Sequence, residues 1–253
     1  MARPDWTDQE IQELARQSAS RARAMIGNWL CGDSDEQEVQ WIPDRWIGRV
    51  DIDTLPEQLP RRRRIRRRDL FDLAGQVTAG CGDPAVVALL IGVVAWGSGN
   101  GVRRAGMSDG DPRGPWRAQQ ALSLPSPAQA ITRIRHAVEI TRRDGAQAAY
   151  AVLSRGGPAK LAAMGESFFT KLIYVSGHRA PTTPRPLPLI LDNNVRKALV
   201  RAGGILESDT WTLYRTPEAY RQYLLLAQTW AELWNMRSDQ VERALFEFGK
   251  SLS

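Results

Sequence analysis

The 253-residue sequence is poor in the side chains that bind metals or form disulfides: it has two cysteines, Cys31 and Cys81, and two histidines, His136 and His178. Two cysteines cannot build a disulfide framework or a four-cysteine zinc or iron–sulfur site. Neither an HExxH nor a CxxC spacing is present, so a catalytic zinc site is not expected. We therefore expect free thiols, structural histidines and no metal, and any chemistry must come from Lys, Asp, Glu, Ser or Tyr.

Uninterrupted apolar runs of the roughly 20 residues needed to cross a bilayer are also missing. The N-terminal sequence MARPDWTDQEIQ lacks the basic start and the apolar middle of an export signal. Hydrophobic residues nevertheless make up 43% of the chain, which is enough for a buried core. These features predict a soluble cytoplasmic protein with no membrane partner.

Lysine is scarce among the basic residues. Of 34 lysines and arginines only four are lysines, namely Lys160, Lys171, Lys197 and Lys250. The net charge of +6 and the pI near 9.7 favour an anionic partner, with nucleic acid first and an acidic membrane surface second. Arginine stays protonated, whereas a lysine with a depressed pKa can act as a nucleophile. Side-chain amine chemistry in this chain therefore rests on four residues.

The periodicity of the apolar residues is helical almost everywhere, which predicts an all-α fold. A capping box at Thr7-Asp8-Gln9-Glu10 opens the first helix, and Asp83-Pro84 reads as an N-cap with proline at the first helical position. We divide the chain into an N-terminal helical extension, residues 1–60, and a main helical domain, residues 61–253. The predicted helices span residues 8–30, 69–77, 85–96, 115–122, 126–143, 146–153, 216–234 and 238–250, with further helices between residues 158 and 200.

Two arginine-bearing segments are candidates for contacts with phosphate. Residues 61–68, RRRRIRRR, hold seven arginines in eight positions, and a glycine-rich loop follows the apolar 85–96 helix. Arginine binds phosphate oxygens through paired hydrogen bonds, and exposed loop amides bind anions. The alternatives are a solvated charged face and a flexible surface loop. The residues selected as phosphate-contacting are Arg63, Arg64, Arg103 and Arg104.

The segment from Pro158, PAKLAAMGESFFTKLIYVSGH, predicts a short helix, a tight turn at residues 164–167 and a second helix that ends near Gly177. This is the outline of a helix-hairpin-helix motif. Phe168, Tyr174 and Val175 share the face of Lys171 on the second helix. Desolvation among such side chains lowers a lysine pKa, as nucleophilic attack at neutral pH requires. The alternative is a lysine at the edge of a buried helix with its head in water.

A second polar residue follows at the end of an apolar run. In LPLILDNNVRKALV, residues 187–200, the run delivers Asp192 to the start of an amphipathic helix. A carboxylate there can serve as a partner for a lysine. An ordinary N-cap role would also account for Asp192.

The two segments together resemble the helix-hairpin-helix DNA glycosylase superfamily. The stretches FFTKLIYVSG and LILDNNVRKAL are similar to bacterial proteins with the 8-oxoguanine DNA glycosylase fold, and the similarity runs from about Asp83 to Lys250. It implies two helical lobes with an active-site cleft between them, Lys171 as nucleophile and Asp192 as its partner. It also implies that the hairpin residues Gly165 and Ser167 contact DNA.

The last predicted helix, SDQVERALFEFG, is similar to the helix with which 8-oxoguanine glycosylases hold the extruded base. The similarity implies that Glu242 hydrogen-bonds the base edge and that Phe246 stacks on its face, since residues four apart share a helical face. We add Trp96, Gly97 and Ser98, at the end of the apolar helix, to the base-binding set. The alternative is a core phenylalanine and a surface acid.

The resemblance implies excision of an 8-oxoguanine-like base flipped from double-stranded DNA, through a Schiff base on Lys171 and with AP-lyase activity. No cofactor is implied, and we expect a monomer in the cytoplasm, associated with the nucleoid. The sequence departs from the family pattern at two places. The family has Gly-hydrophobic-Gly two residues before the lysine, whereas here Gly165 lies six residues before Lys171. Glu242 stands where the family has a glutamine. Alternatives are a glycosylase for bulky modified bases of viral DNA, a non-catalytic helical DNA-binding module and an RNA-binding helical protein.

Overall fold

The computed structural model of the chain describes residues 6–30, 34–46, 48–50, 64–98, 113–203 and 215–252. Among these residues helices dominate, and the β-structure is one antiparallel sheet of two short strands. The predicted all-α class is therefore confirmed. None of the described helices combines the length and the apolarity that a bilayer crossing needs.

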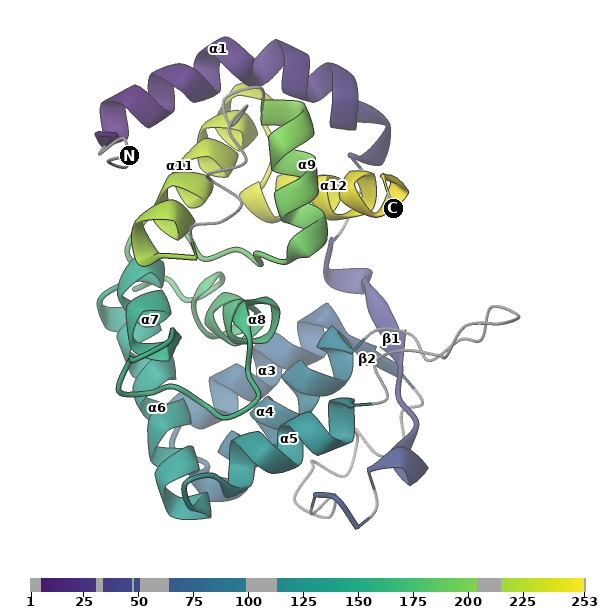
Figure 1. Ribbon diagram of the computed structural model, residues 1–253, viewed down its shortest axis with the longest axis vertical. Helices are drawn as coiled ribbons and strands as arrows, with labels where there is room; N and C mark the ends of the chain where they lie inside the picture. The colour runs from purple at the N-terminus through teal and green to yellow at the C-terminus, as the bar shows by residue number, and fades with distance from the viewer. Residues whose placement is uncertain are drawn as a thin grey trace.

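The helices form two groups that lie one above the other in Figure 1. The lower helix group consists of α3 (Arg67–Thr78), α4 (Gly82–Gly97), α5 (Gly114–Ser123), α6 (Pro127–Arg143), α7 (Ala146–Leu153) and α8 (Glu166–Gly177). The upper helix group consists of α1 (Asp8–Ile26), α9 (Asn193–Gly203), α11 (Pro217–Leu233) and α12 (Ser238–Ser251). The short elements are η1 (Gly27–Trp29), η2 (Ser34–Glu36), η3 (Pro43–Arg45), β1 (Glu38–Gln40) and β2 (Arg64–Arg66).

The first helix begins where the sequence predicts. The Thr7 hydroxyl accepts the Glu10 amide proton at 3.3 Å, and the Glu10 carboxylate accepts the Thr7 amide proton at 2.7 Å, so the predicted capping box is present. The α-helix ends at Ile26, and η1 continues it to Trp29. Helix α4 begins at Gly82, one residue before the predicted N-cap, which places Asp83 inside the first turn.

The predicted first helix of the hairpin, after Pro158, is wrong. Residues 154–165 form turns, and the helix that precedes α8 is α7. The chain reverses at Gly156, whose φ of +87° favours glycine, and the Ala159 amide then donates to the Val152 carbonyl at 2.9 Å. Leu161 is buried in this irregular segment, so the apolar residues that suggested a helix pack without one.

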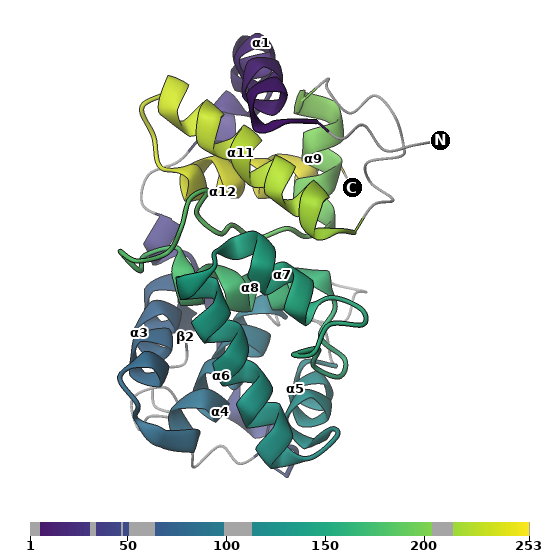
Figure 2. The same cartoon turned by 90° about the vertical axis from the view of Figure 1, so that its left-hand side faces the viewer.

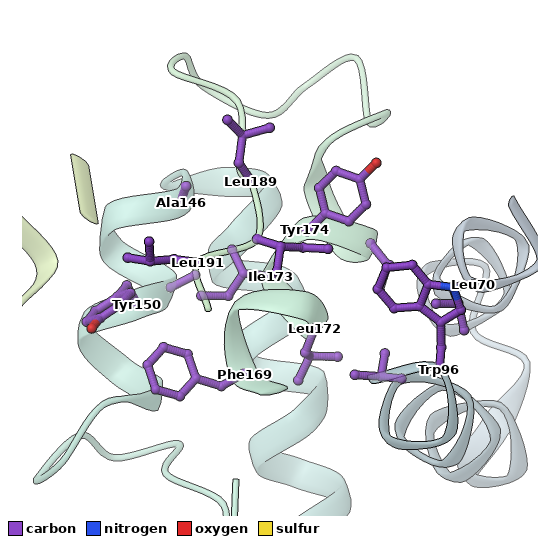
Figure 3. Close-up of a cluster of buried hydrophobic side chains, with 14 of the residues drawn as sticks. Leu70, Trp96, Ala146, Tyr150, Phe169, Leu172, Ile173, Tyr174, Leu189 and Leu191 are labelled. Atoms are coloured by element: carbon purple, nitrogen blue, oxygen red, sulfur yellow. The ribbon is translucent and has the colours of Figure 1, made fainter. Parts of the chain in front are cut away.

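The core is continuous around α4 and α8. Helix α4 is buried all round, as its uniform apolar sequence predicts, and α8 packs on α3, α4, α6 and α7. Close approach of α3 to α4 depends on Gly92, where a Cβ would lie 3.0 Å from side-chain atoms of Leu70 and Leu73. Figure 3 shows side chains of α8 meeting those of α3, α4 and α7 and the extended segment at Leu189 and Leu191.

The two strands join segments on either side of residue 60. Val39 of β1 pairs with Ile65 of β2, with Glu38 opposite Arg66 and Gln40 opposite Arg64. Helix α1 packs on α11 and α9 in the upper helix group. The division into residues 1–60 and 61–253 stays a prediction, although these contacts connect both sides of it.

Candidate active site

Lys171 lies on α8 with its amine withdrawn from bulk water. The residue is 7% exposed, and Nζ donates a hydrogen bond to the Ser167 carbonyl at 2.8 Å. The Phe168 ring lies on the same side, with its centroid 5.8 Å from Nζ. Burial lowers the pKa of the Lys171 ammonium below its ordinary value of 10.5, and the Asp192 carboxylate opposes that shift. The lysine head is therefore not in open solvent, in contrast to the alternative drawn from the sequence.

Asp192 uses its two carboxylate oxygens for different purposes. Oδ1 accepts the amide protons of Asn194 at 3.0 Å and Val195 at 3.1 Å, which caps the start of α9. Oδ2 lies 3.8 Å from Nζ of Lys171. The capping role and the pairing with lysine, which the sequence presents as alternatives, coexist in the structure.

The segment that carries Asp192 is held by side-chain hydroxyls. Tyr220 and Tyr223 of α11 donate to the carbonyls of Leu189 and Ile190, at 2.6 and 3.0 Å. The next residue, Leu191, donates its amide proton to the Thr170 hydroxyl of α8 at 3.1 Å. Three consecutive residues are thus fixed just before Asp192. Sequence reasoning missed these hydroxyls, because nothing local to the tyrosines identifies their partners.

The end of α4 packs directly against the lysine. A Cβ on Gly97 would lie 3.0 Å from Cδ of Lys171 and 3.0 Å from Cε1 of Phe168. Glycine at this position lets the aliphatic part of the lysine lie against the helix. The neighbouring Ser98 hydroxyl donates to the Val94 carbonyl at 2.7 Å. Of the base-binding residues predicted at this helix end, Gly97 lies in close contact with the aliphatic part of Lys171.

Glu242 does not have a free carboxylate. It is 2% exposed, and its Oε2 accepts from Nη1 of Arg67 at 3.1 Å. Arg67 is 1% exposed and also donates to the Tyr174 hydroxyl at 3.1 Å and to Gln37 Oε1 at 2.6 Å. Its Cζ lies 5.3 Å from the Trp96 ring centroid and 5.1 Å from that of Tyr174. Burial raises the pKa of Glu242 to about 7, against the opposing charge of Arg67. The alternative of Glu242 as a surface acid is wrong.

Arg67 belongs to the arginine run at residues 61–68, but it is not among the members selected for phosphate contacts, and its side chain is buried. Arg67 is the first residue of α3 and directly follows β2, in which Ile65 is buried, and its amide donates to the Gln37 carbonyl at 2.9 Å. The isolated apolar residue in RRRRIRRR is the signal that could have revealed this burial. Two other arginines of the run, Arg64 and Arg66, pair with Glu38 at the surface.

The other candidate residues are distributed as follows. Gly165 is the N-cap residue of α8, and Phe246 is partly buried and packs against the core one helical turn after Glu242. Their predicted contacts with DNA and with the base stay predictions. Three of the candidate arginines lie outside the described residues: Arg63, Arg103 and Arg104.

A second buried ion pair fixes α9 relative to α8. Glu166 at the start of α8 accepts from Arg196 of α9 through both oxygens, at 2.6 and 3.1 Å. The Tyr150 hydroxyl of α7 donates to the same carboxylate. Such two-pronged pairs hold geometry well. The pair keeps the helix that Asp192 caps at a constant position beside the helix that carries Lys171.

His178 has a structural environment at the end of α8. Its Nδ1 lies 2.9 Å from the Pro188 carbonyl, and its Nε2 lies 3.6 Å from Asp239, which also accepts from the Tyr174 hydroxyl at 3.2 Å. Burial lowers the pKa of His178 despite the nearby carboxylate. Among the described residues, no group of three or more His, Cys, Asp and Glu side chains is placed to hold a metal ion.

The structure has a buried lysine on the helix after a turn and an aspartate that caps the next helix, which is the arrangement that the resemblance to the helix-hairpin-helix DNA glycosylases implies. The chain belongs to the family described as "Putative 8-oxoguanine DNA glycosylase OGG-like protein", whose model matches residues 32–246. No curated protein and no solved structure matches the chain. The family match begins before the strand pair and ends at Phe246, so it includes the lower helix group and, of the upper helix group, α9, α11 and the first part of α12, but not α1.

Proposed function

We propose that the protein is a DNA glycosylase that removes a modified base from double-stranded DNA with Lys171 as the nucleophile. The observation that carries the proposal is the desolvated amine of Lys171 beside Oδ2 of Asp192, 3.8 Å away. The family supports the reaction class. We further propose that the protein acts as a monomer on chromosomal DNA in the cytoplasm.

In the proposed reaction a base flipped out of the duplex is displaced from its sugar. The unprotonated amine of Lys171 donates its lone pair to C1′, the bond between C1′ and the base nitrogen breaks, and its electron pair leaves with the base, which takes up a proton. Asp192 stabilises the positive charge that develops on the sugar ring. The amine then loses a proton, the sugar ring opens, and a Schiff base between Lys171 and C1′ results.

Strand cleavage follows from the same intermediate. The Schiff base makes the C2′ hydrogen acidic, and loss of that proton expels the 3′ phosphate by β-elimination. Water then hydrolyses the Schiff base and regenerates the amine of Lys171. Each step uses only this lysine, a carboxylate and water, so no cofactor enters the proposal.

The substrate proposed first is 8-oxoguanine, on the strength of the family description. We assign the base-binding role to Glu242, Phe246, Trp96, Gly97 and Ser98, as the resemblance implies. A bulky modified base of viral DNA is the second substrate candidate. The experiment therefore uses a panel of lesions.

The test is reductive trapping. Purified protein is mixed with duplex oligonucleotides that carry 8-oxoguanine, a glycosylated cytosine or a preformed abasic site, and borohydride is added. A Schiff base is reduced to a stable adduct of protein and DNA, which migrates slowly in a denaturing gel. The abasic duplex reports the lysine chemistry even when the correct base is missing from the panel.

The decisive comparison is Lys171→Gln against Lys250→Gln. Both changes remove one positive charge, but Lys250 is exposed in the last turn of α12, in the upper helix group. We expect adducts with the wild type and Lys250→Gln and none with Lys171→Gln. An adduct that survives Lys171→Gln refutes the assignment of the nucleophile. If the wild type forms no adduct with any of the duplexes, the remaining interpretation is a non-catalytic DNA-binding module.

A further inference from the structure

Helix α5 presents a large aromatic side chain to solvent. Trp116 is 42% exposed, whereas the buried residues of the same helix, Gly114, Ala118 and Ala121, face the core. Tryptophan is usually well buried because its indole is large and mainly apolar. A single exposed indole has no meaning by itself, so its location decides what it can do.

The first turn of α5 lies next to the end of α4 that contacts Lys171. A Cβ on Gly114 would lie 2.6 Å from the Ser98 hydroxyl, and a Cβ on the preceding helical residue of α4, Gly97, would touch the lysine stem. Trp116 follows Gly114 by two helical residues, a rise of about 3 Å. The first turn of α5, which carries the exposed indole on its solvent side, therefore lies beside the helix end that contacts Lys171.

Arg117 connects this turn to the segment between α7 and α8. Its Nη1 donates to the Ala163 carbonyl, and its Cζ lies 4.2 Å from the ring centroid of Phe168, three residues before Lys171. Figure 2 shows α5 and that segment on the same side of the lower helix group. The indole, the hairpin turn and the lysine helix thus share one region of the surface.

This region is positively charged. Residues 113–117 and 154–165 together contain four basic side chains and no aspartate or glutamate. Three of the four, Arg113, Arg155 and Lys160, are exposed. A basic surface with an interspersed aromatic side chain fits nucleic acid, in which phosphates alternate with flat bases.

We propose that Trp116 is a base-stacking residue, whose indole covers the base face that is exposed in the duplex when the target nucleotide leaves the stack. The inference rests on the proposed function, because flipping is what exposes that face. An indole restores to the neighbouring base part of the stacking that flipping removes. The basic side chains around it would face the phosphates of the same strand.

The test measures affinity for a duplex with a central tetrahydrofuran residue, an abasic analogue with no glycosidic bond, beside the same duplex without it. The variants are Trp116→Ala, Trp116→Phe and the matched control Trp29→Ala, whose tryptophan is 37% exposed in η1, which packs on α1 and α12. Fluorescence anisotropy of labelled DNA gives Kd at several salt concentrations. Thermal unfolding shows that each variant is folded.

We expect Trp116→Ala to weaken binding of the abasic duplex by about 5- to 140-fold, the equivalent of the ~1–3 kcal/mol of one base–aromatic stack. Trp116→Phe should keep most of the affinity, and Trp29→Ala should match the wild type. The salt dependence should not change, since no phosphate contact is lost.

Four outcomes would overturn the inference. Equal Kd values for Trp116→Ala and the wild type, or an equal loss in Trp29→Ala, would show that Trp116 does not stack on a base. A changed salt dependence would show that the substitution disturbs phosphate contacts instead. Absence of DNA binding by the wild type would refute the proposed function as well, which separates the two failures.

Discussion

Removing Arg67 alone should destabilise the protein far more than removing Arg67 and Glu242 together. In Arg67→Met the Glu242 carboxylate stays buried without its cation, and breaking a buried pair by removing one partner costs about 3–5 kcal/mol. Since a domain of this size loses roughly 2–4 °C of Tm per kcal/mol, the midpoint should fall by about 6–20 °C. In Arg67→Met/Glu242→Leu no charge is left unpaired.

The loss expected for the double variant follows from the contacts of Arg67. Gln37 Oε1 loses a donor at 2.6 Å, whereas the Tyr174 hydroxyl keeps its bond to Asp239. One lost hydrogen bond costs about 1 kcal/mol, and apolar replacement of the pair recovers part of that. The double variant should therefore lie within about 2 kcal/mol of the wild type, although it carries one more substitution.

The pH dependence gives an independent check. The pKa of Glu242 is about 7 in the folded protein, above its ordinary 4.5. Between these values the folded state holds a proton that the unfolded state releases, so this carboxyl lowers stability as pH rises through that window. Without Arg67, which lowers this pKa, the group should keep its proton to still higher pH. The free energy of unfolding that Arg67→Met loses relative to the wild type should therefore be smaller at pH 5 than at pH 8.

The assay is urea unfolding followed by circular dichroism at both pH values. Glu242→Gln serves as a reference, because it keeps an acceptor for Arg67 and removes the titrating group. A double variant as unstable as Arg67→Met would show that the guanidinium contributes mainly through packing. If the loss of unfolding free energy in Arg67→Met is the same at both pH values, the Glu242 carboxylate is not responsible for that loss.

Three further predictions concern the lysine site and use the rate of borohydride trapping on the abasic duplex. Gly97→Ala should slow trapping by up to about 100-fold, because its Cβ would push against Cδ of Lys171; an unchanged rate would mean that the stem moves freely. Tyr223→Phe should lower the maximal rate without changing Kd for DNA, because it releases the segment before Asp192; a loss of affinity alone would contradict that. Trapping should increase with pH as the Lys171 ammonium deprotonates, with a midpoint below the ordinary 10.5, and a rate that is constant with pH would contradict an amine nucleophile.

The sequence predicts the lysine site better than it predicts the groups around it. Lys171 and Asp192 each lie in a local pattern, an apolar helix face and an apolar run that ends at a helix start, and the family resemblance is what pairs them. The inward direction of Arg67 depends on a short strand pair and on partners from three distant segments, which a local pattern does not contain. The missing first hairpin helix has a related cause, since its apolar residues pack in an irregular turn.

Substitutions of Asp192 can distinguish its effect on stability from its effect on the reaction, because one carboxylate oxygen caps α9 and the other faces the lysine. Asparagine caps a helix as well as aspartate does, whereas alanine loses the cap at a cost of about 1 kcal/mol. We therefore expect Asp192→Asn to keep the stability of the wild type and Asp192→Ala to lose about that amount. Both variants should trap DNA slowly, since neither carries a charge to stabilise the sugar cation.

The trapping rate of Asp192→Asn, compared with that of the wild type, is a stringent test of the role of the carboxylate. Loss of the Asp192 charge removes the larger of the two carboxylate charges that raise the pKa of Lys171, those of Asp192 and Glu242, so Asp192→Asn should have a larger fraction of unprotonated amine than the wild type. A slower reaction in spite of the freer nucleophile would assign the carboxylate to the developing positive charge. If Asp192→Asn traps DNA as fast as the wild type at neutral pH, the carboxylate serves α9 alone, and Lys171 acts without a charged partner.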